Sequence, residues 1–218
     1  MRIGILGSGL MGSKLGTIFA RAGHEVVFSY ARSNDKLKKL ARDAQGNAYA
    51  GTPGEAAKDA TALLLAVHWS RTDDVLKQAG DLSGKIILTC SLPMDAANTK
   101  LIIANTSSGA EELAKKVPKS RVVSAFNTIP SEVLFRVFAA RHKKDRPSLA
   151  YCGDDDRGKT VAAELIGRCG LRSHRCRAFT NCTVYRTVRA ARRPTCIRGA
   201  RRAGIGVSVR AVLNKKIN

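Results

Sequence analysis

The stretch ILGSGLMGSKLG, residues 5–16, constrains the fold of this chain more than any other, because its glycines have the spacing G-x-G-x-x-G. The apolar run from Arg2 to Leu6 precedes it and has the composition of a buried strand. Leu10 to Ala22 follow it, with apolar side chains at the spacing of one helix face. The bare motif also occurs in ordinary glycine-rich turns, but between a strand and an amphipathic helix it is typical of dinucleotide binding. We therefore predict that this turn binds the pyrophosphate of a dinucleotide.

Each glycine of the motif has its own predicted role. Gly7 permits the tight turn off the strand, Gly9 lets the pyrophosphate approach the backbone, and Gly12 lets the helix pack closely on the strand. The phosphates would then rest on the N-terminus of the helix, where the backbone amides and the helix dipole favour an anion.

The end of the second predicted strand favours NADP(H) over NAD(H). An NAD site usually offers Asp or Glu to the ribose about 20 residues beyond the glycines, whereas an NADP site offers cations to the 2'-phosphate. The segment VVFSYARSNDK, residues 26–36, has no acid before Asp35. Arg32 can bind a phosphate with two N–H groups, and Ser33 can donate its hydroxyl. A solvated basic loop is the alternative interpretation. The side chains predicted to bind the 2'-phosphate are Tyr30, Arg32, Ser33 and Lys36.

Short apolar runs alternate with helical patterns over most of the chain. This alternation predicts an α/β fold, a Rossmann-type doubly wound and mostly parallel sheet. The predicted strands are residues 2–6, 25–30, 47–50, 62–67, 85–89, 121–125 and 148–152, of which the third is the least distinct. The predicted helices are residues 10–22, 36–44, 72–79, 110–117, 131–140 and 157–169. We assign residues 1–170 to an NADP-binding Rossmann domain.

Residues 171–218 are a predicted atypical, Arg-rich tail. The chain has a net charge of +21, yet up to Glu164 its 24 Lys and Arg face 17 acids, whereas 12 Arg and 2 Lys follow with no acid. Because no helical or strand period is sustained there outside residues 207–213, we expect an irregular or disordered tail. A shift of reading frame near Arg172 is one hypothesis for its origin. Nucleic-acid binding through this tail is the least favoured function, since only Phe179 and Tyr185 are aromatic.

Composition also bears on location and metal binding. The chain has no apolar stretch long enough to span a membrane and no signal sequence, which predicts a cytoplasmic protein without a membrane partner. Six cysteines without a C-x-x-C pair indicate reduced thiols and no metal site. Asp154 to Asp156 precede a predicted helix, and we interpret them as helix-capping acids rather than as metal ligands.

Three segments of the chain resemble a known family: residues 1–32, VVSAFNTIP at 122–130, and YCGDDD at 151–156. They are similar to the small NADP-dependent reductases typified by 8-hydroxy-5-deazaflavin (coenzyme F-420):NADPH oxidoreductase. The resemblance covers about residues 1–172 and implies a Rossmann domain, followed by a short part that completes the deazaflavin cleft and a dimer interface. A homodimer is therefore expected if the C-terminal part folds. After CGLR the family usually continues with a turn like Asp-Ala-Gly-Pro-Leu and an apolar helix, but this chain continues SHRCRAFTNC.

The resemblance also implies roles for individual residues. Those implied at the pyrophosphate are Ser8, Gly9, Leu10 and Met11. Those implied at the 2'-phosphate are Tyr30, Ala31, Arg32 and Ser33. Those implied beside the nicotinamide are Val67, His68, Trp69, Leu92 and Pro93. Those implied to face the hydride acceptor are Asn127, Thr128, Ile129 and Pro130. Archaeal members have His at the position of Asn127, so the identity of the acceptor stays open.

The predicted function is hydride transfer between NADPH and a deazaflavin such as coenzyme F-420, or a related small redox acceptor. The two cofactors carry the reactivity, so no protein acid or base is required. Reduction of a carbonyl or imine would need a proton donor, and the candidate catalytic residues are His68 and Asn127. A structural role explains His68 equally well, and packing explains Trp69 better than cofactor contact. The alternative function is a non-catalytic NADP-binding or sensor protein.

Overall fold

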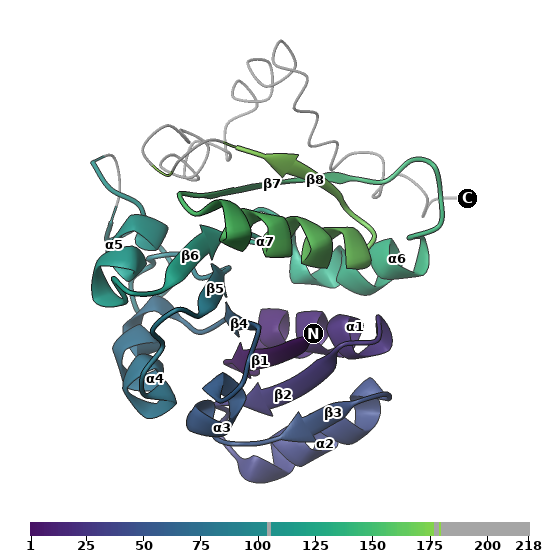
Figure 1. The fold of residues 1–218 in the computed structure, drawn as a ribbon, viewed down its shortest axis with the longest axis horizontal. Helices are drawn as coiled ribbons and strands as arrows, with labels where there is room; N and C mark the ends of the chain where they lie inside the picture. The colour runs from purple at the N-terminus through teal and green to yellow at the C-terminus, as the bar shows by residue number, and fades with distance from the viewer. Residues whose placement is uncertain (104–105, 177–178, 180–218) are drawn as a thin grey trace.

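The computed structural model describes residues 1–103, 106–176 and 179 and folds them around one sheet. Within these residues eight strands lie in the order β3-β2-β1-β4-β5-β6-β7-β8 (Figure 1). Neighbouring strands are parallel, except that β6 and β7 are antiparallel. The predicted fold class, a Rossmann-type α/β sheet that is mostly parallel, is therefore confirmed. Among the described helices, none combines the length and the apolar character needed to cross a bilayer.

The predicted strands and helices are present with ends within two residues of the prediction, except that the predicted helix 131–140 is divided into η2 and α6, so that α6 begins three residues late. The strands are β1 Arg2–Leu6, β2 Glu25–Ser29, β3 Ala48–Ala50, β4 Ala62–Leu65, β5 Ile86–Thr89, β6 Arg121–Ser124, β7 Ser148–Gly153 and β8 Arg172–Arg175. The α-helices are α1 Leu10–Arg21, α2 Asn34–Ala44, α3 Pro53–Ala57, α4 Thr72–Ala79, α5 Gly109–Lys116, α6 Leu134–Ala139 and α7 Asp156–Arg168. Two 3-10 helices, η1 Trp69–Arg71 and η2 Ser131–Val133, directly precede α4 and α6.

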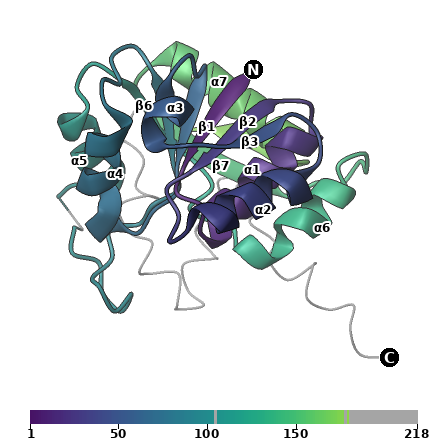
Figure 2. The same ribbon diagram turned by 90° about the horizontal axis from the view of Figure 1, so that it is seen from below.

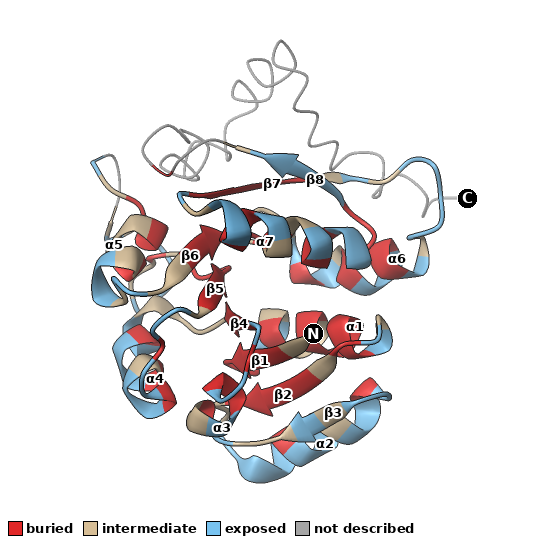
Figure 3. Cartoon of the chain, in the orientation of Figure 1, coloured by how far each residue is buried: buried red, intermediate tan, exposed pale blue. Residues whose placement is uncertain are grey.

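Helices cover both faces of the sheet, so the central strands are buried on both sides. One face packs against α1, α2, α6 and α7, and the other against α3, α4 and α5 (Figure 2). Figure 3 shows the central strands buried, the edge strand β8 exposed and the edge strand β3 half-buried apart from its exposed middle residue. Burying each large apolar side chain contributes about 1.5–3 kcal/mol. Representative helix side chains in the two apolar clusters are Leu15, Leu37, Leu134 and Leu165 on the first face and Ala56, Val75 and Leu113 on the second.

The strand order places a crevice beside the glycine loop. β1 lies between β2 and β4, and the connection through α1 leads to one side of it while the connection through α3 leads to the other. In such open sheets the connections diverge at this reversal and leave a crevice beyond the carboxyl ends of the strands. The loops after β1, β2, β4, β5 and β6 therefore surround the candidate site.

Besides the short 3-10 helix η1, two elements of the structure were absent from the sequence prediction. The helix α3 follows a capping box, in which the hydroxyl of Thr52 accepts from Glu55 N and the Glu55 carboxylate accepts from Thr52 N. The strand β8 lies beyond Gly170, where the sequence indicated no regular structure. All four of its side chains are exposed, so no apolar alternation marked it, and its backbone ladder with β7 forms it instead. The domain division at residue 170 stays a prediction, and residues 180–218 lie outside the described part of the chain.

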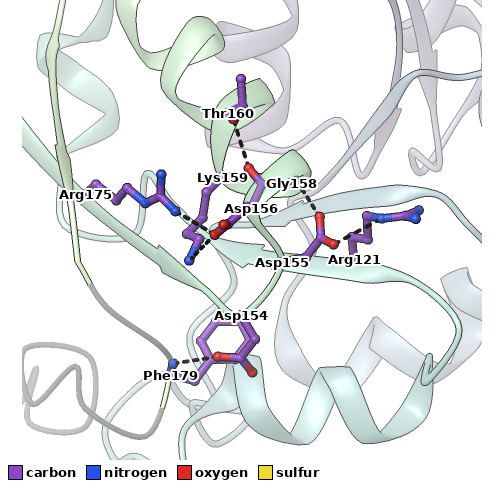
Figure 4. A network of polar contacts seen from close by, with 9 residues as sticks. All are labelled: Arg121, Asp154, Asp155, Asp156, Gly158, Lys159, Thr160, Arg175 and Phe179. Atoms are coloured by element: carbon purple, nitrogen blue, oxygen red, sulfur yellow. Dashed lines mark hydrogen bonds and ion pairs between the residues drawn. The ribbon is translucent and has the colours of Figure 1, made fainter.

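The acids at the β7–α7 junction cap the helix as the sequence predicted (Figure 4). Asp155 is the N-cap of α7, and its carboxylate accepts from Gly158 N at 2.6 Å. The same carboxylate accepts from Arg121 Nε at 3.3 Å, which ties α7 to the start of β6. A carboxylate at a helix N-terminus is stabilised both by the amide bond and by the helix dipole.

Candidate dinucleotide-binding site

The glycine loop has the geometry that each of its three glycines was predicted to provide. Gly7 has φ +111°, and a Cβ there would lie 2.6 Å from Ala66 O. A Cβ on Gly12 would lie 1.8 Å from Gly7 O, so only glycine lets α1 pack this closely on the loop. A Cβ on Gly9, in contrast, would have no atom within 4 Å. The loop is therefore tight at its two ends and open at Gly9, where a phosphate would approach.

The N-terminus of α1 offers backbone amides beside this opening. The first hydrogen bond of α1 runs from Ser13 N to Gly9 O at 2.9 Å, so the amides of Leu10, Met11 and Gly12 have no partner within the helix. Gly9 provides no side-chain cap, and the first turn has no acid. Leu10 is 70% exposed and does not cover the turn with packed core. An anion placed here would receive several N–H groups and the positive end of the helix dipole.

Ser8 holds the loop in place. Its amide donates to Tyr30 O at 3.2 Å, and its hydroxyl donates to Ser29 O at 2.9 Å. The side chain is buried, so both donors of Ser8 are used to join the loop to the end of β2. Ser8 therefore positions the backbone of the glycine loop, and the amides of Leu10, Met11 and Gly12 are the ones left open.

The loop after β2 exposes the cations that the sequence singled out. Arg32 and Lys36 are exposed, and within the described residues their side chains make no hydrogen bond or ion pair. The Ser33 hydroxyl caps α2 by accepting from Lys36 N at 3.3 Å, which leaves its own proton available to donate. Ala31 is half-buried and packs against the core of the α1 face. No carboxylate follows β2 until Asp35 in the first turn of α2.

Tyr30 differs from its neighbours because its hydroxyl is already engaged. It has φ +56°, and the hydroxyl donates to the Asp74 carboxylate on α4. Burial, followed by this bond to Asp74, raises the pKa of Tyr30, and the same bond is the first cause that lowers the pKa of Asp74. The tyrosine therefore joins the β2 loop to α4, and its backbone rather than its hydroxyl borders the loop of Arg32.

The ends of β4 and β5 lie beside the glycine loop and are joined to each other. A Cβ on Gly7 would lie 2.6 Å from Val67 Cγ1, and the Ser91 hydroxyl donates to Val67 O at 2.7 Å. Leu92 is half-buried next to Ser91. Pro93 is buried, and a Cβ on Gly109 at the start of α5 would lie 3.0 Å from its ring. Val67 and Leu92 are therefore placed together beyond the strand ends, and Pro93 packs behind them.

The side chains of His68 and Trp69 make contacts within the protein that stabilise neighbouring loops or line another groove. The Nδ1 atom of His68 accepts from Ser70 N at 3.3 Å and lies 2.9 Å from the Ser70 hydroxyl, which caps η1. Its Nε2 atom lies 3.1 Å from Asp95 O, so it carries the proton and donates it to that carbonyl. Trp69 lines a separate groove of about 420 Å³ with Ile102 and Lys116, away from the glycine loop.

The stretch from Asn127 to Pro130 follows β6 on the far side of the crevice. Asn127 Nδ2 donates to Ser124 Oγ at 3.1 Å, and within the described residues the buried Oδ1 atom has no partner. The preceding Phe126 is fully buried with φ +66°. Thr128 is half-buried, Ile129 packs against the core of the α1 face, and Pro130 is exposed as the N-cap of η2.

A groove of about 780 Å³ opens on the outer side of the β2–α2 loop. Its walls come from α2, β3 and the β3–α3 loop, with Leu37, Ala41 and Tyr49 among them. Tyr30 and Ala31 lie at its border. The groove thus adjoins the predicted 2'-phosphate site and is separate from the opening at Gly9.

Sequence reasoning missed the residues that orient the site through long-range contacts. Asp74 binds Tyr30, Ser91 binds Val67, and Ser124 binds Asn127. Lys14 on α1 donates to Ser131 O at 3.1 Å and so connects the glycine-loop helix to the segment after Asn127. Ser91 and Ser124 follow or end predicted strands, which was an available signal, but nothing local pointed to Asp74 or Lys14.

Comparison with known proteins agrees with this geometry. Residues 2–93 match the model of the family described as NADP oxidoreductase, coenzyme F420-dependent. The matched segment runs from β1 to Pro93 and so contains the glycine loop, the β2–α2 loop and the ends of β4 and β5. This part of the chain is thus similar to an NADP oxidoreductase domain, and Asn127 to Pro130 lie beyond the matched residues.

Solved structures share the fold over most of the chain. A hypothetical protein from Sinorhizobium meliloti is 24% identical, with a TM-score of 0.75 over 86% of this chain and 90% of that one. A protein from Arthrobacter sp. FB24, proposed to be an F420-dependent NADP reductase, is 22% identical. Its TM-score is 0.73, over 95% of this chain and 96% of that one. Pyrroline carboxylate reductase from Plasmodium falciparum, solved with NADP bound, is 16% identical. Its TM-score is 0.55, over 94% of this chain and 69% of that one. At these identities the likeness establishes the fold.

Proposed function

We propose that this chain is an NADP(H)-dependent oxidoreductase that transfers a hydride between NADPH and a deazaflavin of the coenzyme F-420 type, or a related small redox acceptor. The observation that carries the proposal is the open position at Gly9 beside the unpartnered amides of Leu10 to Gly12. The family description of residues 2–93 supports both NADP and the deazaflavin. The relative solved with NADP bound has the same fold and supports the cofactor.

In this proposal the chain binds the cofactor along the carboxyl ends of β1, β2, β4 and β5. The α1 amides hold the pyrophosphate, and Arg32, Ser33 and Lys36 hold the 2'-phosphate. Val67 and Leu92 border the nicotinamide, and Ser91 keeps their backbones together. Asn127 to Pro130 border the acceptor across the crevice. The nicotinamide supplies the hydride and a deazaflavin can take it up, so the reaction needs positioning rather than a protein acid.

Two observations favour these assignments over their alternatives. Arg32 has no partner among the described residues, and no carboxylate stands at the end of β2, so the loop favours a phosphate over a 2'-hydroxyl. Both ring nitrogens of His68 are used within the chain, which supports a structural role and argues against imine or carbonyl reduction through that residue.

The cofactor assignment is tested by titrating the protein with NADPH and NADH and following nucleotide fluorescence. Arg32→Ala removes charge-assisted bonds to phosphate worth about 1.5–3 kcal/mol, so NADPH affinity should fall about 10-fold to 100-fold while NADH affinity hardly changes. Arg157→Ala is the matched control, because it removes an exposed arginine of α7 far from the β2 loop. Equal affinity of the Arg32→Ala and wild-type proteins for NADPH would contradict the assignment.

The acceptor is tested by turnover. The protein with bound NADPH is mixed with a deazaflavin, a flavin and a ferric acceptor, and loss of NADPH absorbance is followed. Turnover with the deazaflavin supports the proposal, and NADPH binding without turnover supports the alternative of a non-catalytic NADP-binding protein. The predicted cytoplasmic location, the homodimer and the nucleic-acid alternative are not needed for this test. The last of these concerns the tail of residues 171–218, of which the structure describes only residues 171–176 and 179.

A further inference from the structure

The pairing of β7 with β8 places two cysteines opposite each other. Arg172 N donates to Pro147 O at 2.9 Å, and Arg172 pairs with Ser148, the next residue of β7. Cys176 N donates to Tyr151 O at 2.8 Å, which is the same offset four residues further along. In a parallel ladder this offset repeats along the strands. Cys176 therefore pairs with Cys152, directly beyond the register pair of Tyr151 and Arg175.

Both cysteine side chains point to the same face of the sheet. Cys152 is 0% exposed within the apolar cluster of the α3–α5 face, and Cys176 is half-buried against that cluster. Neighbouring strands lie about 4.7–4.9 Å apart, within the Cα separation of about 4.4–6.8 Å that a disulfide tolerates. β8 is an edge strand, so it can shift by the small amount needed to bring the two Cβ atoms together. The backbone thus already satisfies the main condition for a cross-strand disulfide.

We propose that Cys152 and Cys176 form a redox-sensitive pair that closes to a disulfide when the protein meets a peroxide. The half-buried Cys176 sulfur, as thiolate, attacks one oxygen of hydrogen peroxide; the O–O bond breaks, and a sulfenic acid and hydroxide form. The Cys152 sulfur then attacks the sulfenyl sulfur, the S–O bond breaks, and water leaves as the S–S bond forms. Overall the two thiols lose two protons and two electrons, which reduce one peroxide to two waters.

Polar contacts hold β8 in the register that this step needs. Arg175 donates to the Asp156 carboxylate at 2.6 Å, and Lys159 pairs with the same oxygen at 3.0 Å (Figure 4). On the other side of Cys176, Phe179 N donates to Asp154 Oδ1 at 3.1 Å. Lys159 is largely buried, so its pair with Asp156 is shielded on one side from solvent. The thiols are therefore held close together whether or not they are bonded.

The pair also lies next to the residue that orients Asn127. Cys152 pairs with Ser124 across β6 and β7, and Ser124 Oγ accepts from Asn127 Nδ2 at 3.1 Å. A disulfide that pulls Cys152 toward β8 acts on the neighbour of this serine. The regulatory consequence rests on the proposed function: oxidation should alter the KM for the acceptor, which Asn127 borders, and leave NADPH affinity unchanged.

Two other described cysteines serve as internal controls. Burial raises the pKa of the Cys90 thiol to about 12, and burial likewise raises the pKa of Cys169. A thiol held protonated is a poor nucleophile toward peroxide. Cys90 follows β5 and Cys169 ends α7, and neither faces a second cysteine across the ladder.

The test uses the full chain, fully reduced and then treated with one equivalent of hydrogen peroxide. Peptide mapping without reductant should find a Cys152–Cys176 cross-link, and the number of titratable thiols should fall by two. Cys176→Ser and Cys152→Ala should each abolish the cross-link, whereas Cys169→Ala should retain it. A cross-link from Cys176 to Cys182 or Cys196, or none after complete oxidation of Cys176, would overturn the proposal.

NADPH titration and acceptor kinetics on the same samples separate this proposal from the proposed function. A cross-link that forms in a protein unable to bind NADPH leaves the redox pair standing and refutes the oxidoreductase. Normal NADPH turnover without a cross-link supports the oxidoreductase and refutes the redox pair. A cross-link that changes NADPH affinity and not the acceptor KM would refute the connection through Ser124 and Asn127.

Discussion

Gly9 is the position at which adding one methyl group should impair the proposed nucleotide binding without destabilising the fold. Its φ of −77° and ψ of −158° lie in the extended region that alanine adopts without strain. A Cβ there would have no atom within 4 Å, so the methyl group of Gly9→Ala points into open space. That space is the one a pyrophosphate needs above the α1 amides. The substitution should therefore leave the fold intact and impair binding.

Gly9→Ala should change the free energy of unfolding less than it changes the free energy of NADPH binding. Replacing glycine by alanine at a helix N-cap costs less than about 1 kcal/mol of the free energy of unfolding. Moving the pyrophosphate away from the amides weakens at least one charge-assisted hydrogen bond worth about 1.5–3 kcal/mol. NADPH affinity should then fall about 10-fold to 100-fold. The affinity loss should exceed the stability loss.

Urea denaturation and NADPH fluorescence titration of three variants measure this difference. Gly12→Ala places its Cβ 1.8 Å from Gly7 O, so it should lower the free energy of unfolding by about 1–3 kcal/mol or more. Gly167→Ala, at an open position in α7, should raise it by about 0.5–1 kcal/mol and leave NADPH affinity unchanged. If folded Gly9→Ala protein binds NADPH as wild type does, the phosphate does not approach Gly9 and the reasoning is refuted.

Three further predictions concern other parts of the molecule. Burial, followed by the charges of the N-terminal amine and Arg168, lowers the pKa of His24 below 6.5. The unfolded chain therefore takes up the proton first, and the free energy of unfolding falls as the pH drops below about 6.5. Urea titrations at pH 7.5 and 5.5 should show this fall, and His24→Gln should make it smaller. Asn127→Ala removes one hydrogen-bonding group worth about 1 kcal/mol from the acceptor side, so steady-state kinetics should show an acceptor KM raised about 5-fold with NADPH affinity unchanged. Oxidation of Cys152 and Cys176 closes a loop in the unfolded chain and should raise the free energy of unfolding by about 3 kcal/mol in urea, with no change in Cys176→Ser.

The part of the fold that local pattern encodes could be predicted from the sequence. The glycine spacing, the apolar run before it and the amphipathic helix after it are properties of about 20 consecutive residues, and the structure has the same strand, turn and helix there. The cations after β2 were found for the same reason, because a missing carboxylate is visible in the sequence. Where the pattern was weak, prediction failed: β8 has no buried side chain, and α3 has only five residues.

The contacts that orient the site could not be predicted, because they join segments far apart in the chain. Tyr30 meets Asp74 across 44 residues, and Ser91 meets Val67 across 24. The spacing of apolar residues along the chain carries no information about contacts between segments so far apart in sequence. The role of His68 was left open for the same reason, and only the structure supplies its partner Asp95, 27 residues away.

The cofactor side and the acceptor side of the crevice differ in the same way, in how far local sequence determines them. In the proposed function, the phosphate part of the cofactor side comes from a local motif, although Ser91 binds Val67 of the same side across 24 residues. The acceptor side is placed by the long-range contact from Lys14 to Ser131 and by the bond from Asn127 to Ser124. The proposed hydride transfer would depend on how the two rings lie relative to each other, so its rate would depend on the contacts that join the sides rather than on either side alone. Lys14 lies on α1 one turn beyond the glycine loop, and its bond to Ser131 fixes the acceptor loop relative to the helix that would hold the phosphates. The residues that set the rate in this chain are therefore expected among these connecting side chains, none of which belongs to the G-x-G-x-x-G motif.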